Sequence, residues 1–567
     1  MEKINLPCGI DNFEKLRTSA CYYIDKTGFI CELLNETFSV NLITRPRRFG
    51  KTLAMSMLAE FFDIRKDSRS LFEGLEISRE GELCEKWMNQ QPVLFLTLKD
   101  IDGADFSDAY DMIQFTIASL CEEHRYLLDS ERVSDTDKKR FRRLIEQAGG
   151  KNDVKTALFV LTRMMKAHYG KDVILLVDEY DVPLAKSSDH GYYEEMLDII
   201  KSFLGMAWKS NPALQFAVVT GCLRIAKESI FTGANNFITN SVSDEHYEKC
   251  FGFTEEEVGT LLEASGLSGH LPEMRRWYDG YRFGSAEVYC PWDVVNHVRA
   301  LQKNENARPG NYWRDTSHNN IIRRFIDVKS NAVNGKFETL LAGGTIREQI
   351  VEDLNYDNAN SSEDYLWSIL YLTGYLTRAE AEKEELPDGR ERFEPYMELR
   401  IPNEEVKTIF ADTVKEWFTD TVEKTDRNAF FREWWNGEAD RLTNEITDIL
   451  FDTISYFDYR EDYYHAFMAG LFSGAGYEVQ SNSEQGRGRA DLLITDRRNK
   501  RALIIEVKRV SKEELMEQAC RDALVQIAEQ EYARSFQREG YETILCYGAS
   551  FWKKSCLLKV ERCYPQP

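Results

Sequence analysis

Two acidic side chains and a lysine near the end of the chain have the types and spacing of a metal-dependent hydrolytic centre. Glu506 and Lys508 stand two positions apart in an apolar run, so in a strand both side chains emerge on one face. Asp491 lies in a preceding strand-like run that a polar turn joins to the first, and its side chain can reach the same face. The two carboxylates and the carbonyl of Val507 form an oxygen site suited to Mg²⁺. Lys508 would orient or deprotonate an attacking water and stabilise charge that develops on phosphorus.

The position of Glu506 favours this chemistry over a purely structural role. It interrupts an otherwise apolar run, and a buried carboxylate is costly unless it binds something. The same spacing also occurs on strand pairs that hold no metal, so a domain that binds without cutting is the alternative. Upstream, Glu461 is either a further acidic ligand or a solvated helix start, and His465 is expected to pack or to support the site.

A second group of residues has the form of a phosphate-binding loop between a strand and a helix. Gly50 lets the backbone approach phosphate, and the amides at the helix start offer donors and the positive end of the helix dipole. Lys51 would reach the β- and γ-phosphates of ATP, and the Thr52 hydroxyl would bind Mg²⁺. Arg45 stands where the strict pattern has glycine, so a basic turn before a helix is the alternative for the loop alone. The whole loop is Arg45, Pro46, Arg47, Arg48, Phe49, Gly50, Lys51 and Thr52.

Adjacent acids at the end of a buried strand supply the second half of this centre. The run Val173–Asp178 is followed by Glu179, in the form of a Walker B motif. Asp178 would hold Mg²⁺ through water, and Glu179 would polarise the water that attacks the γ-phosphate. Acidic pairs after strands are common, but this one follows the loop after an intervening strand, which makes the combination specific.

The elements that position these residues alternate between strands and helices over the first part of the chain. Near-continuous apolar runs separated by helical patterns predict a parallel sheet that is covered on both faces. A capping box at Thr254–Glu257 begins a mainly helical region, a hairpin is expected over 376–398, and a helix from 401 through Trp417. The four expected strands are 39–45, 92–98, 173–178 and 214–220, with helices at 52–62 and 154–168 among them.

These motifs resemble those of a bacterial AAA-ATPase-like family whose members carry a C-terminal PD-(D/E)XK nuclease-superfamily domain. The resemblance implies that arginine at position 45 is usual, that Thr220 senses the γ-phosphate, and that Arg224 is a sensor or finger arginine, or else lies on the surface. It also gives Gln526 the role of a catalytic glutamine that RecB-like and Holliday-junction-resolvase-like nucleases carry on a helix. The stretches that carry it, besides the Asp491–Lys508 arrangement, are Tyr23–Thr27, Arg45–Thr52, Asp178–Asp181, Thr220–Ile230, Phe251–Glu257, Trp277–Tyr281 and Tyr312-Trp313.

The predicted fold class is therefore α/β. It comprises a P-loop NTPase (AAA-like) parallel sheet with a helical lid region, followed by a C-terminal α/β PD-(D/E)XK nuclease-like domain. The expected parts are the P-loop domain at 1–250, the lid-like region at 251–345, a mainly helical connection with a hairpin at 346–455, and the nuclease-like domain at 456–567. For Tyr23–Thr27 and Trp277–Tyr281 we expect packing roles.

Composition narrows the classes of function. No apolar run reaches the length of a membrane span, the first residues lack a signal-peptide pattern, and 12 cysteines without a CxxC pair suit a reduced cytoplasm. The net charge of -23 excludes a general DNA-coating protein. Residues 461–567, however, hold 16 basic and 16 acidic side chains. The positive residues expected beside the metal centre are Arg487, Arg489, Arg497, Arg498, Lys500, Arg501, Lys508 and Arg509.

The sequence thus predicts an ATP-binding and ATP-hydrolysing protein coupled to a Mg²⁺-dependent nuclease, in the cytoplasm, without membrane contact and with a homo-oligomer left open. DNA is the preferred substrate and RNA stays open; a role in prokaryotic defence or mobile-element biology follows from the class alone. The alternative is a nucleotide-dependent switch whose nuclease-like domain binds without cutting. A scaffold without catalysis comes third, because it leaves two catalytic constellations without a purpose.

Overall fold

The computed structural model divides into two compact units. The N-terminal unit comprises Met1–His318 and Arg347–Val406, and the C-terminal unit comprises Asn319–Ile346 and Lys407–Pro567. The structure describes residues 4–225, 237–313, 336–337, 339–341, 343–352, 354, 363–379, 396–410, 427–453, 464, 467–469, 472, 477–485 and 488–563.

The N-terminal unit is built on a parallel sheet of five strands in the order β2-β3-β4-β1-β5. Every residue of β1 and β3 is buried, which explains their continuous apolar sequence. The four predicted strands are confirmed, and a short edge strand, β5, joins them without having been predicted. The strands are β1 (Val40–Thr44), β2 (Val93–Thr97), β3 (Val173–Asp178), β4 (Leu214–Gly221) and β5 (Phe237–Asn240).

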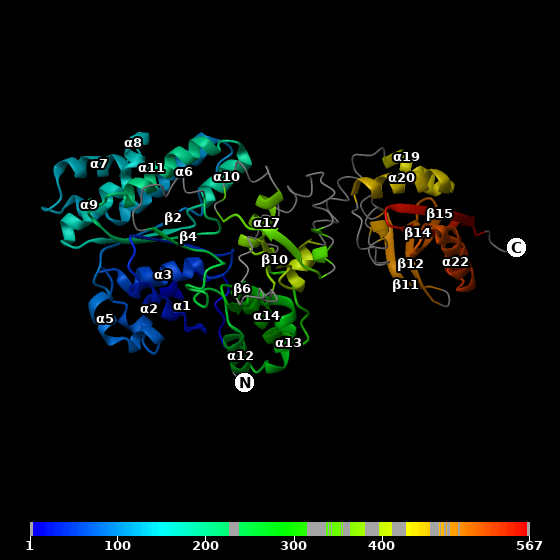
Figure 1. Cartoon of the computed structure of the whole chain (residues 1–567), viewed down its shortest axis with the longest axis horizontal. Coiled ribbons are helices and arrows are strands. Elements are labelled where there is room, and N and C mark those ends of the chain that lie inside the picture. The colour runs from blue at the N-terminus through cyan, green and yellow to red at the C-terminus, as the bar shows by residue number, and fades with distance from the viewer. Residues whose placement is uncertain are drawn as a thin grey trace, which may run out of the picture. The chain divides into compact units, whose positions relative to one another are not determined.

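Helices cover both faces of this sheet, as predicted for a parallel sheet. Figure 1 shows α6, α7, α9 and α11 on one face and α1, α2, α3 and α5 on the other. The bounds are α1 Phe13–Thr18, α2 Gly28–Asn35, α3 Lys51–Phe62, α4 Arg69–Phe72, α5 Gly81–Trp87, α6 Phe106–Glu123, α7 Asp135–Ile145, α8 Lys151–Lys155, α9 Ala157–Tyr169, α10 Val182–His190 and α11 Tyr193–Trp208.

A helical region with two small sheets completes the N-terminal unit. Its first helix begins at the predicted capping box, in which Thr254 and Glu257 each bind the other's backbone amide. Of the predicted hairpin, the paired ends β9 and β10 are antiparallel, and the residues between them lie outside the described chain. The elements are α12 Glu255–Ala264, α13 Leu271–Tyr278, β6 Tyr281–Phe283, β7 Ala286–Val288, α14 Pro291–Lys303, β8 Ile346–Gln349, α17 Glu363–Leu372, β9 Thr377–Arg378 and β10 Tyr396–Arg400.

Two sequence stretches of this unit, for which packing roles are expected, make close contacts with other segments. Thr27 accepts a hydrogen bond from the amide of Ile77 at 3.2 Å, which ties the Tyr23–Thr27 stretch to the following turn. In Trp277–Tyr281, Gly280 has φ +90°, and a Cβ there would lie 2.2 Å from the carbonyl oxygen of Pro402. The glycine is therefore required for the close approach of these two segments.

The C-terminal unit is a mixed five-stranded sheet in the order β11-β12-β13-β14-β15, with helices on both faces. One face packs on α19 and α20, while residues that alternate with these along β12 and β13 pack on α22. The predicted hairpin is β12 and β13, which pair antiparallel. The elements are α19 Arg427–Asn436, α20 Ala439–Thr453, β11 Glu478–Gln485, β12 Gly488–Asp496, β13 Arg501–Arg509, α22 Met516–Glu529, α23 Arg534–Arg538, β14 Thr543–Trp552 and β15 Ser555–Arg562.

Helix α20 covers the free edge of this sheet. The amides of Cys556 and Leu558 in the edge strand β15 donate to the hydroxyls of Thr447 and Thr443, at 3.1 and 3.0 Å. Such cover protects an edge strand from pairing with other chains. The C-terminal unit includes α19 and α20, and the expected boundary at 455/456 stays a prediction.

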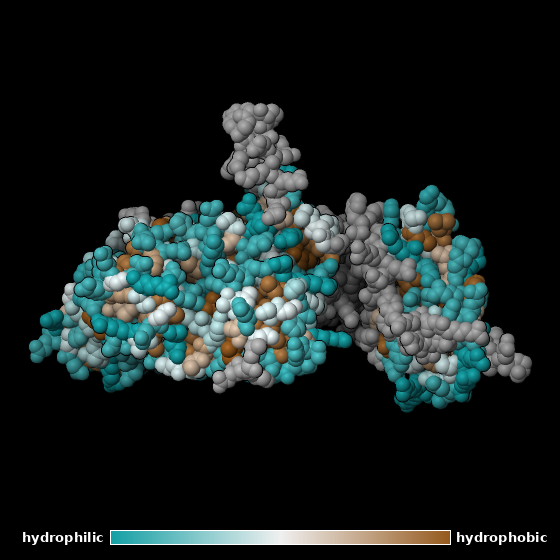
Figure 2. Space-filling model, turned by 90° about the horizontal axis from the view of Figure 1, so that it is seen from below, coloured by the Kyte–Doolittle hydropathy of each residue, from teal (hydrophilic) through white to brown (hydrophobic). Residues whose placement is uncertain are grey.

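The surface shows no large apolar face among the described residues. Figure 2 shows hydrophobic side chains scattered among hydrophilic ones on the face in view. Large hydrophobic side chains that are exposed occur singly, as at Phe115, which is 56% exposed, and Val525, which is 52% exposed. Within the described segments, no helix combines the length and apolar character that a bilayer crossing requires.

Candidate active sites

The carboxyl ends of β1, β4 and β3 bring the polar residues of the first centre together. Thr220, the last but one residue of β4, donates its hydroxyl to Asp178 Oδ1 at 2.6 Å. Thr52, in the first turn of α3, donates its hydroxyl to Asp178 Oδ2 at 2.8 Å. Asp178 is fully buried, and its pKa is raised, first by burial and then by the charge of Glu179. The structure thus joins three predicted residues that are up to 168 positions apart into one hydrogen-bonded group.

Lys51 is the first residue of α3, and its side chain is buried against the preceding loop. Its ammonium donates to the carbonyls of Arg45 and Pro46 at 3.0 and 3.1 Å and lies 3.4 Å from Glu179 Oε1. Burial by itself lowers the pKa of this lysine, but the nearby thiol of Cys222 and the surrounding carboxylates, Glu179 foremost, outweigh burial and raise it. Lys51 is therefore a fixed positive charge at the loop, as a phosphate site requires.

Glu179 occupies a strained backbone position. It follows the last residue of β3 with φ +53°, in the left-handed region that non-glycine residues rarely adopt. Such strain costs about 1–3 kcal/mol and concentrates at functional sites. The turn brings the carboxylate back toward Lys51.

Asp181 belongs to this centre, although the sequence motifs assign it no role. It is buried, and its Oδ2 accepts hydrogen bonds from the amides of Cys222 and Leu223, both at 3.0 Å. Burial, and then the charge of Glu179, raises its pKa to about 6. A Cβ on Gly221 would lie 2.6 Å from Asp181 Oδ1, so glycine is needed there. The fourth position of Asp-Glu-Tyr-Asp is the one signal that could have identified this residue.

The loop side chains point outward and pack against the rest of the unit. The guanidinium of Arg45 is buried and donates to the carbonyls of Thr44, Asn240 and Ser241, so the structure gives this side chain a different task from the predicted contact with nucleotide. Phe49 packs between Tyr281 and Phe283, with ring centroids 5.0 Å from each.

The remaining loop residues and Arg224 also have defined places. The Arg48 guanidinium lies over the ring of Trp292 at 4.3 Å, and the Arg47 carbonyl accepts from Trp313 Nε1 at 3.4 Å. The Pro46 ring lies against Gly374. Arg224 follows β4, and its carbonyl accepts from the amide of Leu354 at 3.2 Å.

The second centre forms on the α22 face of the C-terminal sheet. Leu492 pairs with Ile505 in the antiparallel register, so the next residues along the two strands, Asp491 and Glu506, lie opposite each other. Asp491 Oδ2 accepts from the amide of Val507 at 2.9 Å, and Lys508 Nζ donates to Glu506 Oε1 at 2.9 Å. From α22, the amide nitrogen of Gln526 donates to the same Glu506 oxygen. All five predicted residues of this centre therefore lie together.

Glu506 has the properties expected of a cation ligand. It is 1% exposed, and its second oxygen, Oε2, is buried without a hydrogen-bond donor among the described groups. Burial raises its pKa, and the charge of Asp491 adds to this, while Lys508 opposes it. Among the described residues, no three His, Cys, Asp or Glu side chains cluster to hold a metal. A cation here would take two carboxylates, the Val507 carbonyl and waters, which fits Mg²⁺ and its retained water shell.

Family models match two separate parts of the chain. Residues 7–231 match a family model described as a predicted AAA-ATPase, AAA-ATPase-like, and residues 459–561 match one described as the PD-(D/E)XK nuclease superfamily. The chain resembles AAA-ATPase-like proteins with a C-terminal PD-(D/E)XK nuclease-superfamily domain. An uncharacterized protein in the vnfD 5' region of Azotobacter chroococcum mcd 1 is 27% identical over 573 residues, covering 98% of each chain.

The sequence predicts basic side chains around the nuclease-like centre, and this prediction is wrong for the residues of the β12–β13 turn. Arg501 opens β13 five residues before Glu506, which at about 3.3 Å per residue is roughly 16 Å away. Arg501 is paired with Asp496 and lies over Trp435, while Arg497 is paired with Glu478. The residues of the turn therefore lie far from the metal centre, which is at the other end of β12 and β13. Glu461, His465 and Arg487 lie outside the described residues.

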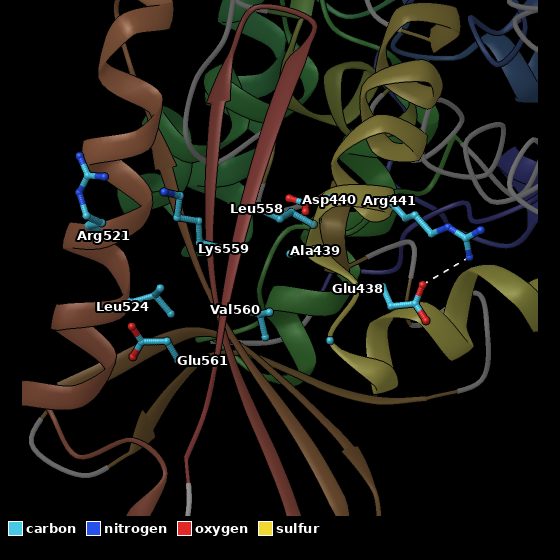
Figure 3. Close-up of a pocket in the computed structure, with 11 residues that line it drawn as sticks. Glu438, Ala439, Asp440, Arg441, Arg521, Leu524, Leu558, Lys559, Val560 and Glu561 are labelled. Atoms are coloured by element: carbon cyan, nitrogen blue, oxygen red, sulfur yellow. Dashed lines mark hydrogen bonds and ion pairs between the residues drawn. The ribbon is translucent and has the colours of Figure 1, made fainter.

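A cavity of about 590 Å³ in the nuclease-like domain is separate from this centre. Figure 3 shows it between the start of α20, the strand β15 and α22. Arg521 and Lys559 at its wall are both paired with Glu517, and Arg441 with Glu438. Because acidic and basic groups balance there, the cavity offers no excess positive charge to an anionic backbone. Its lining is Gly437, Glu438, Ala439, Asp440, Arg441, Arg521, Leu524, Leu558, Lys559, Val560 and Glu561.

Proposed function

We propose that the protein binds and hydrolyses ATP in its N-terminal unit and cleaves nucleic acid, DNA before RNA, in its C-terminal unit. The observation that carries the proposal is Glu506. It is a buried carboxylate with one oxygen bound by Lys508 and Gln526 and the other without a donor. Burial of this acid is costly unless a cation or a proton compensates it, and Asp491 on the paired strand gives a cation a second carboxylate.

In the ATPase-like unit, the loop backbone and Lys51 bind the phosphates. The hydroxyl of Thr52 and the carboxylate of Asp178, already hydrogen-bonded to each other, would hold Mg²⁺, which supplies charge neutralisation between the phosphates. Glu179 lies beside Lys51 and accepts a proton from the attacking water. Thr220 fixes Asp178 from the neighbouring strand.

In the nuclease-like unit, Asp491, Glu506 and the Val507 carbonyl would hold Mg²⁺, which stabilises charge on the phosphate. Lys508, whose side chain is 27% exposed, orients the attacking water from the open side of the centre. Gln526 fixes the rotamer of Glu506 from α22. ATP bound in the N-terminal unit gates this cleavage. An ATPase coupled to a nuclease suits a role in prokaryotic defence or mobile-element biology.

One observation favours a nucleotide-dependent switch as the second candidate. Glu179, the proposed base for ATP hydrolysis, is ion-paired with Lys51 at 3.4 Å. If nucleotide does not release this pair, ATP binds without turnover and changes only an interaction surface.

Two assays on one preparation separate these functions. Phosphate release from ATP is measured with and without DNA, and nicking of supercoiled plasmid in Mg²⁺ is measured with and without ATP. The proposal predicts ATP turnover and Mg²⁺-dependent nicking whose rate depends on ATP. ATP binding without turnover, together with no nicking in Mg²⁺ or Mn²⁺, would instead establish the switch.

A further inference from the structure

Two carboxyl groups, which we call the acid pair, lie buried behind the phosphate loop. Asp293 stands in the first turn of α14, and Glu405 stands at the start of the helical residues 404–410. Both are 0% exposed. Burial raises the pKa of Asp293, and the charge of Arg48 in the loop opposes this with a smaller effect.

Among the described groups, three oxygens of the acid pair have no hydrogen-bond donor. No nitrogen or oxygen donor of the described residues reaches either oxygen of Asp293 or the Oε2 of Glu405. One proton shared between the carboxyls would bridge Glu405 Oε2 and one oxygen of Asp293, because a protonated acid donates to the other carboxylate. Burial and the charge of Asp293 raise the pKa of Glu405 strongly, in agreement with this arrangement.

Each member of the acid pair is linked to one carbonyl of the phosphate loop. Glu405 Oε1 accepts from the backbone amide of Trp313 at 2.9 Å, and the indole Nε1 of Trp313 donates to the Arg47 carbonyl at 3.4 Å. Asp293 lies beside the thiol of Cys290, whose sulfur is 3.9 Å from the Arg48 carbonyl. Trp313 is itself fully buried against Tyr375, with ring centroids 4.8 Å apart.

These two contacts orient the amides that a phosphate would need. In a trans peptide the C=O and the following N–H point in opposite directions. Holding the carbonyls of Arg47 and Arg48 toward the helical region therefore turns the amides of Arg48 and Phe49 toward the other side of the loop. Neither amide donates a hydrogen bond to a described group.

We infer that Asp293, Glu405, Cys290 and Trp313 are positioning residues for nucleotide binding, which hold the tip of the phosphate loop in its anion-binding conformation. The inference rests on the proposed ATP site and adds residues that none of its motifs contains. It also gives a task to the Tyr312-Trp313 stretch, which the sequence left without one. The glutamine side chain can replace a protonated Glu405, since its carbonyl accepts and its amide donates.

The test compares three variants of the full chain by hydrogen exchange of the loop peptide, residues 45–52, and by titration with a fluorescent ATP analogue. Glu405→Gln should match the unchanged protein in both. Glu405→Met should speed exchange of the loop and weaken binding about 10-fold, the cost of about one hydrogen bond to a fixed group. Trp313→Phe, which removes only the indole donor, should give a smaller change of the same sign.

Hydrogen exchange of the loop distinguishes failure of this inference from failure of the proposed ATP site. Glu256→Met, at an exposed site of α12, controls for the substitution itself. Loop exchange that stays unchanged in both Glu405→Met and Trp313→Phe would overturn the inference, whether or not nucleotide binds. Loop exchange that changes as expected in a protein that binds no nucleotide would support the inference and overturn the ATP site.

Discussion

The two centres are assembled from the chain in different ways. The ATPase-like centre gathers Thr52, Asp178 and Thr220 from strand ends that are far apart in sequence. The nuclease-like centre takes Asp491, Glu506 and Lys508 from one hairpin, and α22 adds a single glutamine. Both pair a lysine with a glutamate, at 3.4 Å in the first and 2.9 Å in the second.

The two centres differ in whether the oxygens of their buried acid are all hydrogen-bonded. Asp178 has both oxygens bound by threonine hydroxyls, so its centre is complete as a protein network. Glu506 keeps one oxygen without a donor, so its centre is completed only by an added cation or proton. Substitution of Lys508 should therefore change chemistry, whereas substitution of Asp178 should also disturb local structure, because two threonine hydroxyls lose their acceptor.

The largest effect is expected from Lys508→Ala or Asp491→Ala. Each removes a group that acts on the scissile phosphate, so nicking of plasmid should fall by at least about 10²–10³-fold while ATP turnover stays within twofold. Lys512→Ala and Asp522→Ala, at exposed positions of the same domain, are the matched controls. Nicking that survives both active-site changes in purified protein contradicts the site assignment.

Glu179→Gln should separate binding of ATP from its hydrolysis. The amide keeps the shape of the side chain but cannot accept a proton, so phosphate release should fall roughly 10²-fold or more. Affinity for an ATP analogue should stay within a few fold. Glu194→Gln, exposed on α11, serves as the control, and unchanged turnover in Glu179→Gln would remove this residue from the mechanism.

Gly221→Ala tests the steric limit at the end of β4. The new methyl group would lie 2.6 Å from Asp181 and 2.7 Å from the ring of Tyr180, so we expect a loss of about 1–3 kcal/mol in stability. Thermal unfolding measures it. Gly259→Ala on α12, where a Cβ meets nothing within 4 Å, should be neutral or stabilising. Equal melting temperatures for the two variants would count against the close packing of Asp181.

A pH dependence of stability is expected from the acid pair. Because the pKa of Glu405 is raised above its unfolded value, the folded chain binds a proton that the unfolded chain has lost. Stability should therefore fall as pH rises from about 4.5 toward the folded pKa, by at most about 1.4 kcal/mol per pH unit. The groups that act on Asp293 and Glu405 include Arg48 and Cys290.

Glu405→Gln removes the titrating group and keeps its hydrogen bonds. Its melting temperature should fall less steeply than that of the unchanged protein between pH 5 and pH 9, measured by calorimetry. Parallel slopes for the two proteins would show that Glu405 holds no extra proton.

Local spacing was sufficient to predict that Asp491, Glu506 and Lys508 lie together, and to predict the four core strands. Glu506 and Lys508 share a face by strand alternation alone, and the strand ends of β3 and β4 are visible as apolar runs that stop at polar residues. Family resemblance supplied Gln526, since a helix position twenty residues from Glu506 has no pattern that links it to the site.

Other features of the two centres depend on tertiary packing and could not be predicted from the sequence. Arg45 looks like a phosphate contact in sequence, but burial turns its guanidinium to the carbonyls at the end of β5, a strand too short to be recognised. The basic turn at Arg497–Arg501 lies close to Glu506 in sequence and far along the strand in space. The acid pair joins positions 293 and 405, and no spacing rule connects residues across such a distance.

The most direct test of the coupled function is the plasmid-nicking rate of Lys51→Ala, with and without ATP, beside the unchanged protein and the exposed-site control Lys139→Ala. We expect the unchanged protein and the control to nick in Mg²⁺ at a rate that ATP alters. Lys51→Ala should retain Mg²⁺-dependent nicking but lose all response to ATP, because the two centres are separate and the first gates the second. A Lys51→Ala protein whose nicking still responds to ATP, or an unchanged protein that does not nick, would contradict the account.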